Sequence, residues 1–96
     1  MEDLTITRQG DATSGEYRAH FAGIAQTGLL QWTQSGAVRS ADHTLVPPEL
    51  RGRGIAGRLV DALIADAREQ GFRIRPACSY VAAAFENHPE WADLKA

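Results

Sequence analysis

The stretch HTLVPPELRGRGIAGRLVDALI (residues 43–64) joins a strand-like segment to an apolar helix through a turn rich in glycine and arginine. Two prolines end the strand pattern, because proline cannot donate to a central hydrogen-bond ladder. Three arginines then surround the start of the helix: Arg51, Arg53 and Arg58. A helix needs neither glycines nor this density of positive charge to begin, since a single polar cap suffices. The turn is therefore the first place to look for a ligand.

Alternation of apolar and polar side chains predicts four strands before this turn. They cover residues 4–9, 16–21, 27–33 and 38–46, separated by turn-like segments at 11–15, 22–26 and 34–37. Links this short favour an antiparallel meander.

After the turn, the period of the apolar residues changes to that of a helix. Over residues 55–70 they recur at three- and four-residue steps and form one stripe: Ala56, Leu59, Val60, Leu63, Ile64 and Ala67. Gly71 is placed to end this helix. Residues 72–79 alternate like a strand, residues 80–87 suit a second helix with Ser79 as its N-cap, and residues 88–94 suit a last helical turn. The order predicts an α+β fold, a meander followed by an α-β-α crossover with helices against a sheet.

The size and composition of the chain limit its function. Its 96 residues suit one domain spanning residues 1–96. With 44% hydrophobic and 23% charged residues it has an ordinary globular composition, which excludes disordered and fibrous classes. The net charge of −2 argues against a general nucleic-acid binder. Six of the ten basic residues still lie between Arg51 and Arg75, and such clustering suits a small anion.

Cysteine and histidine are too few and too scattered for a metal site. Cys78 is the only cysteine, so neither an internal disulfide nor a thiolate cluster can form. His20, His43 and His88 lack the compact spacing of a zinc motif, so we expect no metal. No signal-like segment opens the chain, and no run approaches the ~20 apolar residues of a membrane helix. The expected location is cytoplasmic, with no membrane partner.

The chemistry of the turn at 51–58 points to phosphate. Glycines let the backbone approach a ligand closely, and a helix N-terminus presents unpaired amides with a partial positive charge. Arginine forks match phosphate oxygens. The turn is not a Walker loop, because no Lys-Ser/Thr pair follows its last glycine, and it lacks the glycine spacing of the dinucleotide fingerprint. The alternative is an arginine-rich turn that is merely solvated.

The segment Arg51-Gly52-Arg53-Gly54-Ile55-Ala56 resembles the Arg/Gln-x-x-Gly-x-Gly/Ala signature of the GNAT superfamily of N-acetyltransferases. With RPACSYV (75–81) and HPEW (88–91), the chain is similar to the minimal, single-domain GNAT-like proteins over roughly residues 16–94. The resemblance implies acetyl-CoA as acyl donor, held between splayed fourth and fifth strands. It assigns the donor site to eight residues: Leu45, Val46, Arg51, Gly52, Arg53, Gly54, Ile55 and Ala56.

Three side chains are candidates for the chemistry of acyl transfer. The amine must lose a proton, and the leaving thiolate should gain one. The resemblance places Tyr80 as general acid to the sulfur of CoA and Cys78 close to the thioester, where a thiol can accept the acetyl group if its pKa is lowered. The alternatives are a tyrosine packed in the core and a cysteine that is only a small buried apolar residue.

His43 is the candidate base, because its pKa suits proton transfer near neutrality. Strict alternation along the predicted strand puts it on one face with Ala41 and Leu45. The alternative is a histidine that is hydrogen-bonded to a cross-strand neighbour.

Two functions follow. The first is an acetyl-CoA-dependent N-acetyltransferase acting on an unidentified amine or protein acceptor. The second is a CoA or acyl-CoA binding module with little catalysis. A small nucleic-acid-binding domain is a third, weaker hypothesis, and we expect no nucleic-acid partner. Larger GNAT enzymes carry helices between their first two strands that shape the acceptor site, and GDATSG (10–15) leaves no room for them. The acceptor therefore stays open.

Overall fold

A computed structural model describes residues 3–96. The elements follow in the order β1 (Leu4–Gly10), β2 (Ser14–Phe21), β3 (Thr27–Ser35), β4 (Val38–Leu45), η1 (Pro48–Leu50), α1 (Ile55–Gln70), β5 (Arg73–Pro76), α2 (Ser79–Asn87) and η2 (Pro89–Leu94). This order confirms the predicted succession of four strands, a helix, a strand and a helix, and the α+β class with it.

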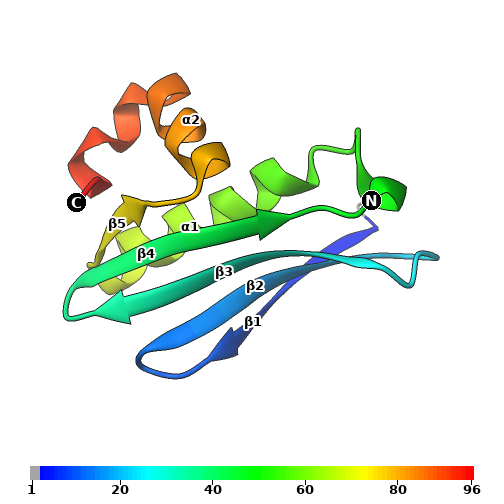
Figure 1. Ribbon diagram of the computed structural model, residues 1–96, viewed down its shortest axis with the longest axis horizontal. Coiled ribbons are helices and arrows are strands. Elements are labelled where there is room, and N and C mark those ends of the chain that lie inside the picture. Colours follow the sequence, from blue (N-terminus) through cyan, green and yellow to red (C-terminus); the bar gives the residue numbers. More distant parts are fainter. Residues whose placement is uncertain (1–2) are drawn as a thin grey trace.

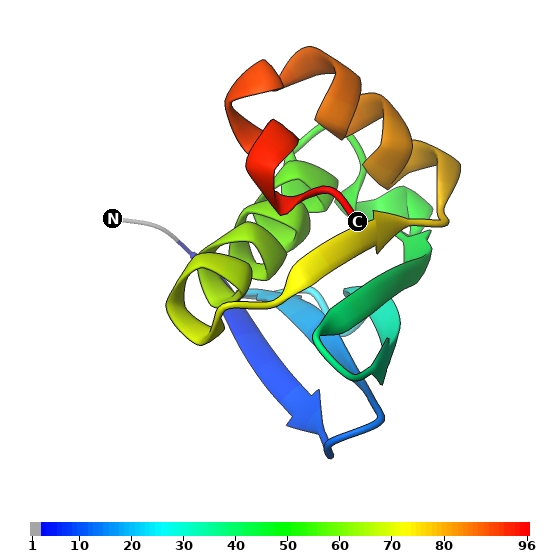
Figure 2. The same cartoon turned by 90° about the vertical axis from the view of Figure 1, so that its left-hand side faces the viewer.

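The five strands form one sheet in chain order (Figure 1). Strands β1 to β4 are antiparallel neighbours, as predicted for a meander, and β5 adds to β4 in parallel after the α1 crossover. Helix α1 lies along one face of β1–β3, and α2 lies beside β5 (Figure 2). The opposite face of β1–β4 carries no helix (Figures 1 and 2).

The apolar stripe of α1 forms the core against the inner face of the sheet. Its fully buried members include Leu59 and Leu63, which meet Leu30 of β3 and Ile74 of β5 in one cluster. Burial of such a side chain contributes about 1.5–3 kcal/mol. The stripe is therefore part of the core rather than a partner surface. Within residues 3–96, no helix is both long and apolar enough to cross a membrane.

A buried arginine, which the sequence analysis missed, lies between two aromatic rings. The guanidinium carbon of Arg39 lies 3.6 Å from the ring centroid of Trp32 and 4.1 Å from that of Phe72. Its Nη1 donates to the hydroxyl of Tyr17 at 2.8 Å, and its Nε donates to Gln34 Oε1 at 2.8 Å. Arginine stacks well on aromatic rings because its planar cation is weakly hydrated.

The same hydroxyl links this arginine to a carboxylate on α1. Tyr17 donates to Asp66 Oδ2 at 2.8 Å, and Arg8 Nε lies 2.9 Å from the same oxygen. Burial raises the pKa of Tyr17, and its hydrogen bond to Asp66 raises it further. The tyrosine therefore stays protonated and relays the network from β4 through β2 to α1. We name Arg39, Tyr17, Asp66 and Arg8 the buried polar network.

Strand β4 contains a bulge that corrects one prediction. Trp32 pairs with Ala41, and its neighbour Gln31 pairs with His43, so Asp42 is an extra residue on β4. Because successive residues of β3 point to opposite faces, the residues that pair with them also do. The prediction that His43 shares a face with Ala41 is therefore wrong: Ala41 is buried, and His43 is exposed on the uncovered face.

The last strand is shorter than predicted, and the second helix is capped one residue earlier. Strand β5 ends at Pro76, which has no N–H for the ladder. The N–H of Cys78 then donates to Ala41 O at 2.8 Å, and its carbonyl accepts the first helical bond from Ala82 at 2.9 Å. Cys78 is therefore the N-cap of α2, and Ser79 is the first helical residue rather than the cap.

Candidate functional site

The two central strands of the candidate site separate halfway along β4. Strand β4 pairs with β5 only from Val38 opposite Arg73 to Ala41 opposite Pro76. Beyond that point β4 continues to Leu45, while the segment after β5 turns away into α2 (Figure 1). Within residues 3–96, the backbone of residues 42–45 has no β5 partner. A strand with a free edge can bind the amide groups of an extended ligand.

The turn before α1 is open and presents unpaired amides. Gly52 and Gly54 adopt left-handed φ angles of 81° and 71°, and a Cβ placed on either would meet nothing within 4 Å. The first helical hydrogen bond of α1 runs from Arg58 N–H to Gly54 O at 3.2 Å. Within residues 3–96, the preceding amides, those of residues 55–57, have no recorded helical acceptor, and they are available to a phosphate.

Two arginines of the turn contact the chain itself. Arg51 Nε donates to Val46 O at 3.2 Å, and the guanidinium of Arg53 lies 4.7 Å from the ring centroid of Phe21. These contacts brace the turn against the end of β4 and against β2. The positive charge stays at the mouth of the turn, and direct contact of either guanidinium with phosphate stays a prediction.

Cys78 lies where β4 and β5 part, with its thiol 3.5 Å from Thr44 Oγ1 on β4. Burial, the largest single influence, raises the pKa of the thiol. Hydrogen bonding from Thr44 and from the backbone amides of Val81 and Tyr80 outweighs burial, so the pKa lies below its ordinary value. Those two amides belong to the first turn of α2, where the helix dipole also favours a thiolate.

Arg73 and Arg75 are the arginines nearest to Cys78 in the sequence, and neither accounts for this shift of the pKa. Both are exposed on β5, while Phe72 and Ile74 alternate with them into the core. Neither arginine is among the main influences on the pKa of Cys78.

The lowered pKa predicts how the thiol reacts with iodoacetamide as the pH changes. The thiolate is the reactive form, so the alkylation rate should rise with pH and reach half its maximum at a lower pH in the folded chain than in the unfolded chain. Thr44→Val should move this midpoint upward, because it removes a donor to the thiolate. The rates are measured by intact mass, with the urea-unfolded chain as control. An equal midpoint in folded and unfolded chains would contradict the prediction.

The other two candidate residues border the same parting from different sides. His43 is exposed on the uncovered face, where it shares a row with Gln31. Tyr80 is 43% exposed, and its hydroxyl lies 3.9 Å from the Cβ position of Gly57 in the first turn of α1. In the part of the chain that the structure describes, no hydrogen bond is recorded between the side chains of His43, Cys78 and Tyr80, although the backbone amide of Tyr80 contacts the Cys78 thiol.

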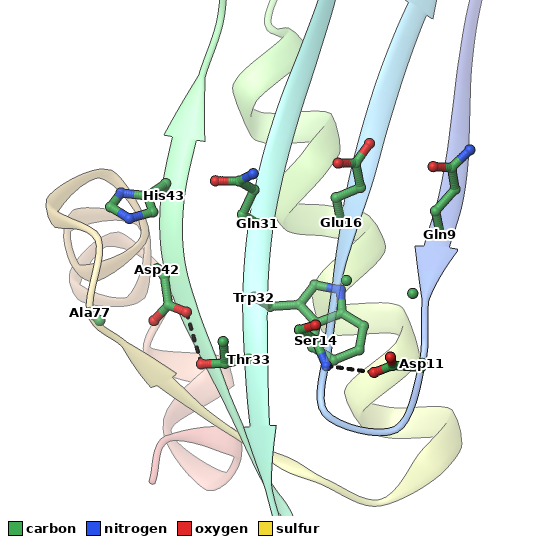
Figure 3. A pocket seen from close by; sticks show the side chains of 12 residues that line it. Gln9, Asp11, Ser14, Glu16, Gln31, Trp32, Thr33, Asp42, His43 and Ala77 are labelled. Atoms are coloured by element: carbon green, nitrogen blue, oxygen red, sulfur yellow. Dashed lines mark hydrogen bonds between the residues drawn. The ribbon is translucent and has the colours of Figure 1, made fainter.

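A wide groove of about 840 Å³ runs across the uncovered face of the sheet (Figure 3). Its twelve lining residues include a single register row with one residue from each of β1 to β4: Gln9, Glu16, Gln31 and His43. At one end the groove reaches Ala77, the residue before Cys78. The groove therefore ends beside the parting of β4 and β5. Sequence reasoning missed this groove, because the bulge that adds His43 to the row leaves no mark in the alternation.

Comparison with known proteins agrees with this geometry. A family profile described as GCN5-related N-acetyl-transferase matches residues 16–94. The chain belongs to this GNAT-related family. Its fold is also similar to the NMR solution structure of a GCN5-like candidate N-acetyltransferase from Staphylococcus aureus, with a TM-score of 0.74 and 24% identity over 100% of this chain and 91% of that one. The predicted resemblance and the predicted fold are therefore both confirmed.

Proteins of the GNAT family typically use acetyl-CoA, and the residues of this chain fit that molecule. The open glycines and unpaired amides of the turn suit a pyrophosphate, and the free edge of β4 suits the amide groups of the pantetheine arm. Both features lie at the same end of the sheet, at the C-terminal end of β4 (Figure 1).

Proposed function

We propose that this protein binds acetyl-CoA along the free edge of β4 and transfers the acetyl group to an amine. The observation that carries the proposal is the parting of β4 and β5 beyond Ala41, at the point where Cys78 places a thiol of lowered pKa. If the separation of β4 and β5 served only the fold, a cysteine with a lowered pKa would not be needed beside it. Family membership supplies the reaction class.

The chain holds the donor at two places. The backbone amides at the start of α1, those of residues 55–57, bind the phosphates, while Gly52 and Gly54 leave room for them and Arg51 and Arg53 add positive charge around the turn. The backbone of Leu45 and Val46 offers hydrogen bonds to the pantetheine arm. When bound, acetyl-CoA supplies a thioester whose carbonyl carbon is open to attack.

The lowered pKa of the thiol supports a route through Cys78, and direct attack by the amine is the alternative. The thiolate of Cys78 forms a carbon–sulfur bond to the carbonyl carbon as the bond to the CoA sulfur breaks, and Tyr80 gives its proton to the departing thiolate. The amine nitrogen then attacks the acetylated cysteine, and Sγ leaves as thiolate while His43 takes the proton of the amine. In the direct route the amine attacks first, with the same tasks for Tyr80 and His43.

Intact mass separates these routes. Incubation with acetyl-CoA and no amine should add one acetyl group, and Cys78→Ser should abolish the adduct because serine without a base is a far poorer nucleophile. Calorimetry should show that Cys78→Ser still binds acetyl-CoA. An adduct that survives this substitution would exclude Cys78. Binding without an adduct, together with turnover of an amine, would establish the direct route, and no binding at all would refute the proposal.

The second candidate function is a CoA-binding module with little turnover. One observation favours it: within residues 3–96, no hydrogen bond is recorded between the side chains of His43, Cys78 and Tyr80, whereas a catalytic base must come within hydrogen-bond reach of the proton that it takes. An amine panel with saturating acetyl-CoA decides between the two, since the module binds the donor and transfers nothing.

A further inference from the structure

We infer that the uncovered face of β1–β4 is the acceptor surface and that it selects an amine carrying a second positive charge. The inference rests on the proposed function, because it assumes that the acetyl group is presented at the parting of β4 and β5. It adds what that proposal leaves open, the chemical class of the acceptor.

The groove on this face is built by four strands in register. Gln9 pairs with Glu16, Glu16 with Gln31 and Gln31 with His43, so the four side chains form one straight row across the sheet. Figure 3 shows them pointing to the same side, with no helix in front of them. The row begins beside the parting, at His43, and leads away from it.

The lining of the groove is negative. Among its described lining residues are three carboxylates and neither lysine nor arginine: Asp11, Glu16 and Asp42. The oxygens of Asp42 accept hydrogen bonds from the hydroxyls of Ser40 at 2.6 Å and Thr33 at 2.8 Å, which leave its charge uncompensated. A concave surface lined by one sign of charge attracts ligands of the opposite sign.

Glu16 is the carboxylate best placed to bind a distant ammonium group. One of its oxygens lies 2.6 Å from Arg18 Nε, and Arg18 is also held by Thr27 at 2.7 Å. In the described part of the chain no donor is recorded for the other oxygen, Oε1. The half-buried carboxylate therefore has one fixed oxygen and one available to a cation in the groove.

The sheet sets the distance between the two ends of such an acceptor. Glu16 lies two strands away from His43, and neighbouring strands are roughly 4.8 Å apart, so the separation is about 10 Å. An amine whose second ammonium lies about that far from the reactive nitrogen would meet Glu16 while its other end reaches the parting. A neutral or single-charged amine would lack this second contact.

The first test is an NMR titration that needs no turnover. The probe is diaminooctane with terminal amines, and the matched probe is aminooctanol, which replaces the distal ammonium with a hydroxyl. The diamine should shift the amide signals of Glu16, Gln31 and His43 at concentrations where aminooctanol does not. Glu16→Gln should weaken diamine binding roughly fivefold. Glu86→Gln, the same change on the exposed end of α2, should leave it unaltered.

The second test is transfer itself. With acetyl-CoA saturating, kcat/KM should be higher for diaminooctane than for aminooctanol or ethylenediamine, and Glu16→Gln should remove this preference while leaving aminooctanol unchanged. Shifts that map outside the groove, or equal use of all three amines, would overturn the inference and leave the proposed function standing. Tighter binding of duplex DNA than of the diamine to this face would also overturn it. Diamine binding by a chain that fails to bind acetyl-CoA would refute its role as acceptor surface.

Discussion

Replacing Arg39 with alanine should lower the free energy of unfolding by about 3 kcal/mol or more, a large part of the stability of a chain this size. The guanidinium fills the space between Trp32 and Phe72 and donates to Tyr17, so alanine removes both packing and a charge-assisted hydrogen bond. The loss is measured by urea denaturation followed by tryptophan fluorescence and circular dichroism.

Two further variants separate the effect of the buried position of Arg39 from the effect of losing any arginine. Arg73→Ala removes an exposed arginine from the adjacent strand and should change the stability by less than about 0.5 kcal/mol. Arg39→Lys keeps the charge and loses the planar stacking, so it should fall between the two. A loss below about 1 kcal/mol for Arg39→Ala would mean that the two rings close over the gap and that the arginine is dispensable.

Gly54→Val should weaken acetyl-CoA binding at least tenfold, which corresponds to about 1.4 kcal/mol. The valine side chain would project into the open space where the phosphates approach, and its Cβ branch would resist the left-handed φ of 71°. The dissociation constant is measured by calorimetry on protein that is first shown to be folded.

Backbone strain must be separated from the blocked site, and the chain contains a suitable control. Gly36 has a φ of 59° and open space around its Cβ position, in the turn between β3 and β4 at the far end of the sheet (Figure 1). Gly36→Val should cost about 1–3 kcal/mol of strain, as Gly54→Val does, and leave the affinity for acetyl-CoA unchanged. Equal binding by both variants and the parent would show that the turn does not hold the phosphates.

Periodicity in the sequence predicted the arrangement of elements because it depends on many residues at once. Four alternating segments with short links leave few options besides a meander, and the stripe on α1 runs over four turns. Single-residue events left no such signal. Asp42 adds one residue to β4 and moves His43 to the other face, and Pro76 ends β5 before Cys78. Alternation alone predicted neither event.

The buried polar network escaped prediction for a different reason. Arg39 and Asp66 are charged residues on the buried faces of β4 and α1, and a charge on such a face is usually read as solvent-exposed. Their partners in space offset the cost of burying the charges: Tyr17 hydrogen-bonds both residues, and the rings of Trp32 and Phe72 stack on Arg39. At the candidate site, the resemblance made Cys78 a candidate, and this stays a prediction, while its cap position and the contact with Thr44 needed the fold.

The sheet has one seam that joins distant parts of the chain. Strands β1 to β4 are joined to their neighbours by short turns. Strand β5 can pair with β4, Val38 opposite Arg73, only after α1 has packed across the sheet. Loop-closure entropy delays such pairings, so we expect β5 to join last during folding and to separate first in native-state hydrogen exchange. Under the proposed function, the donor would bind directly beyond the seam that assembles last. A molecule that contacts both β4 and α2 there stabilises the paired strands over the separated ones, so acetyl-CoA should slow hydrogen exchange of the β5 amides.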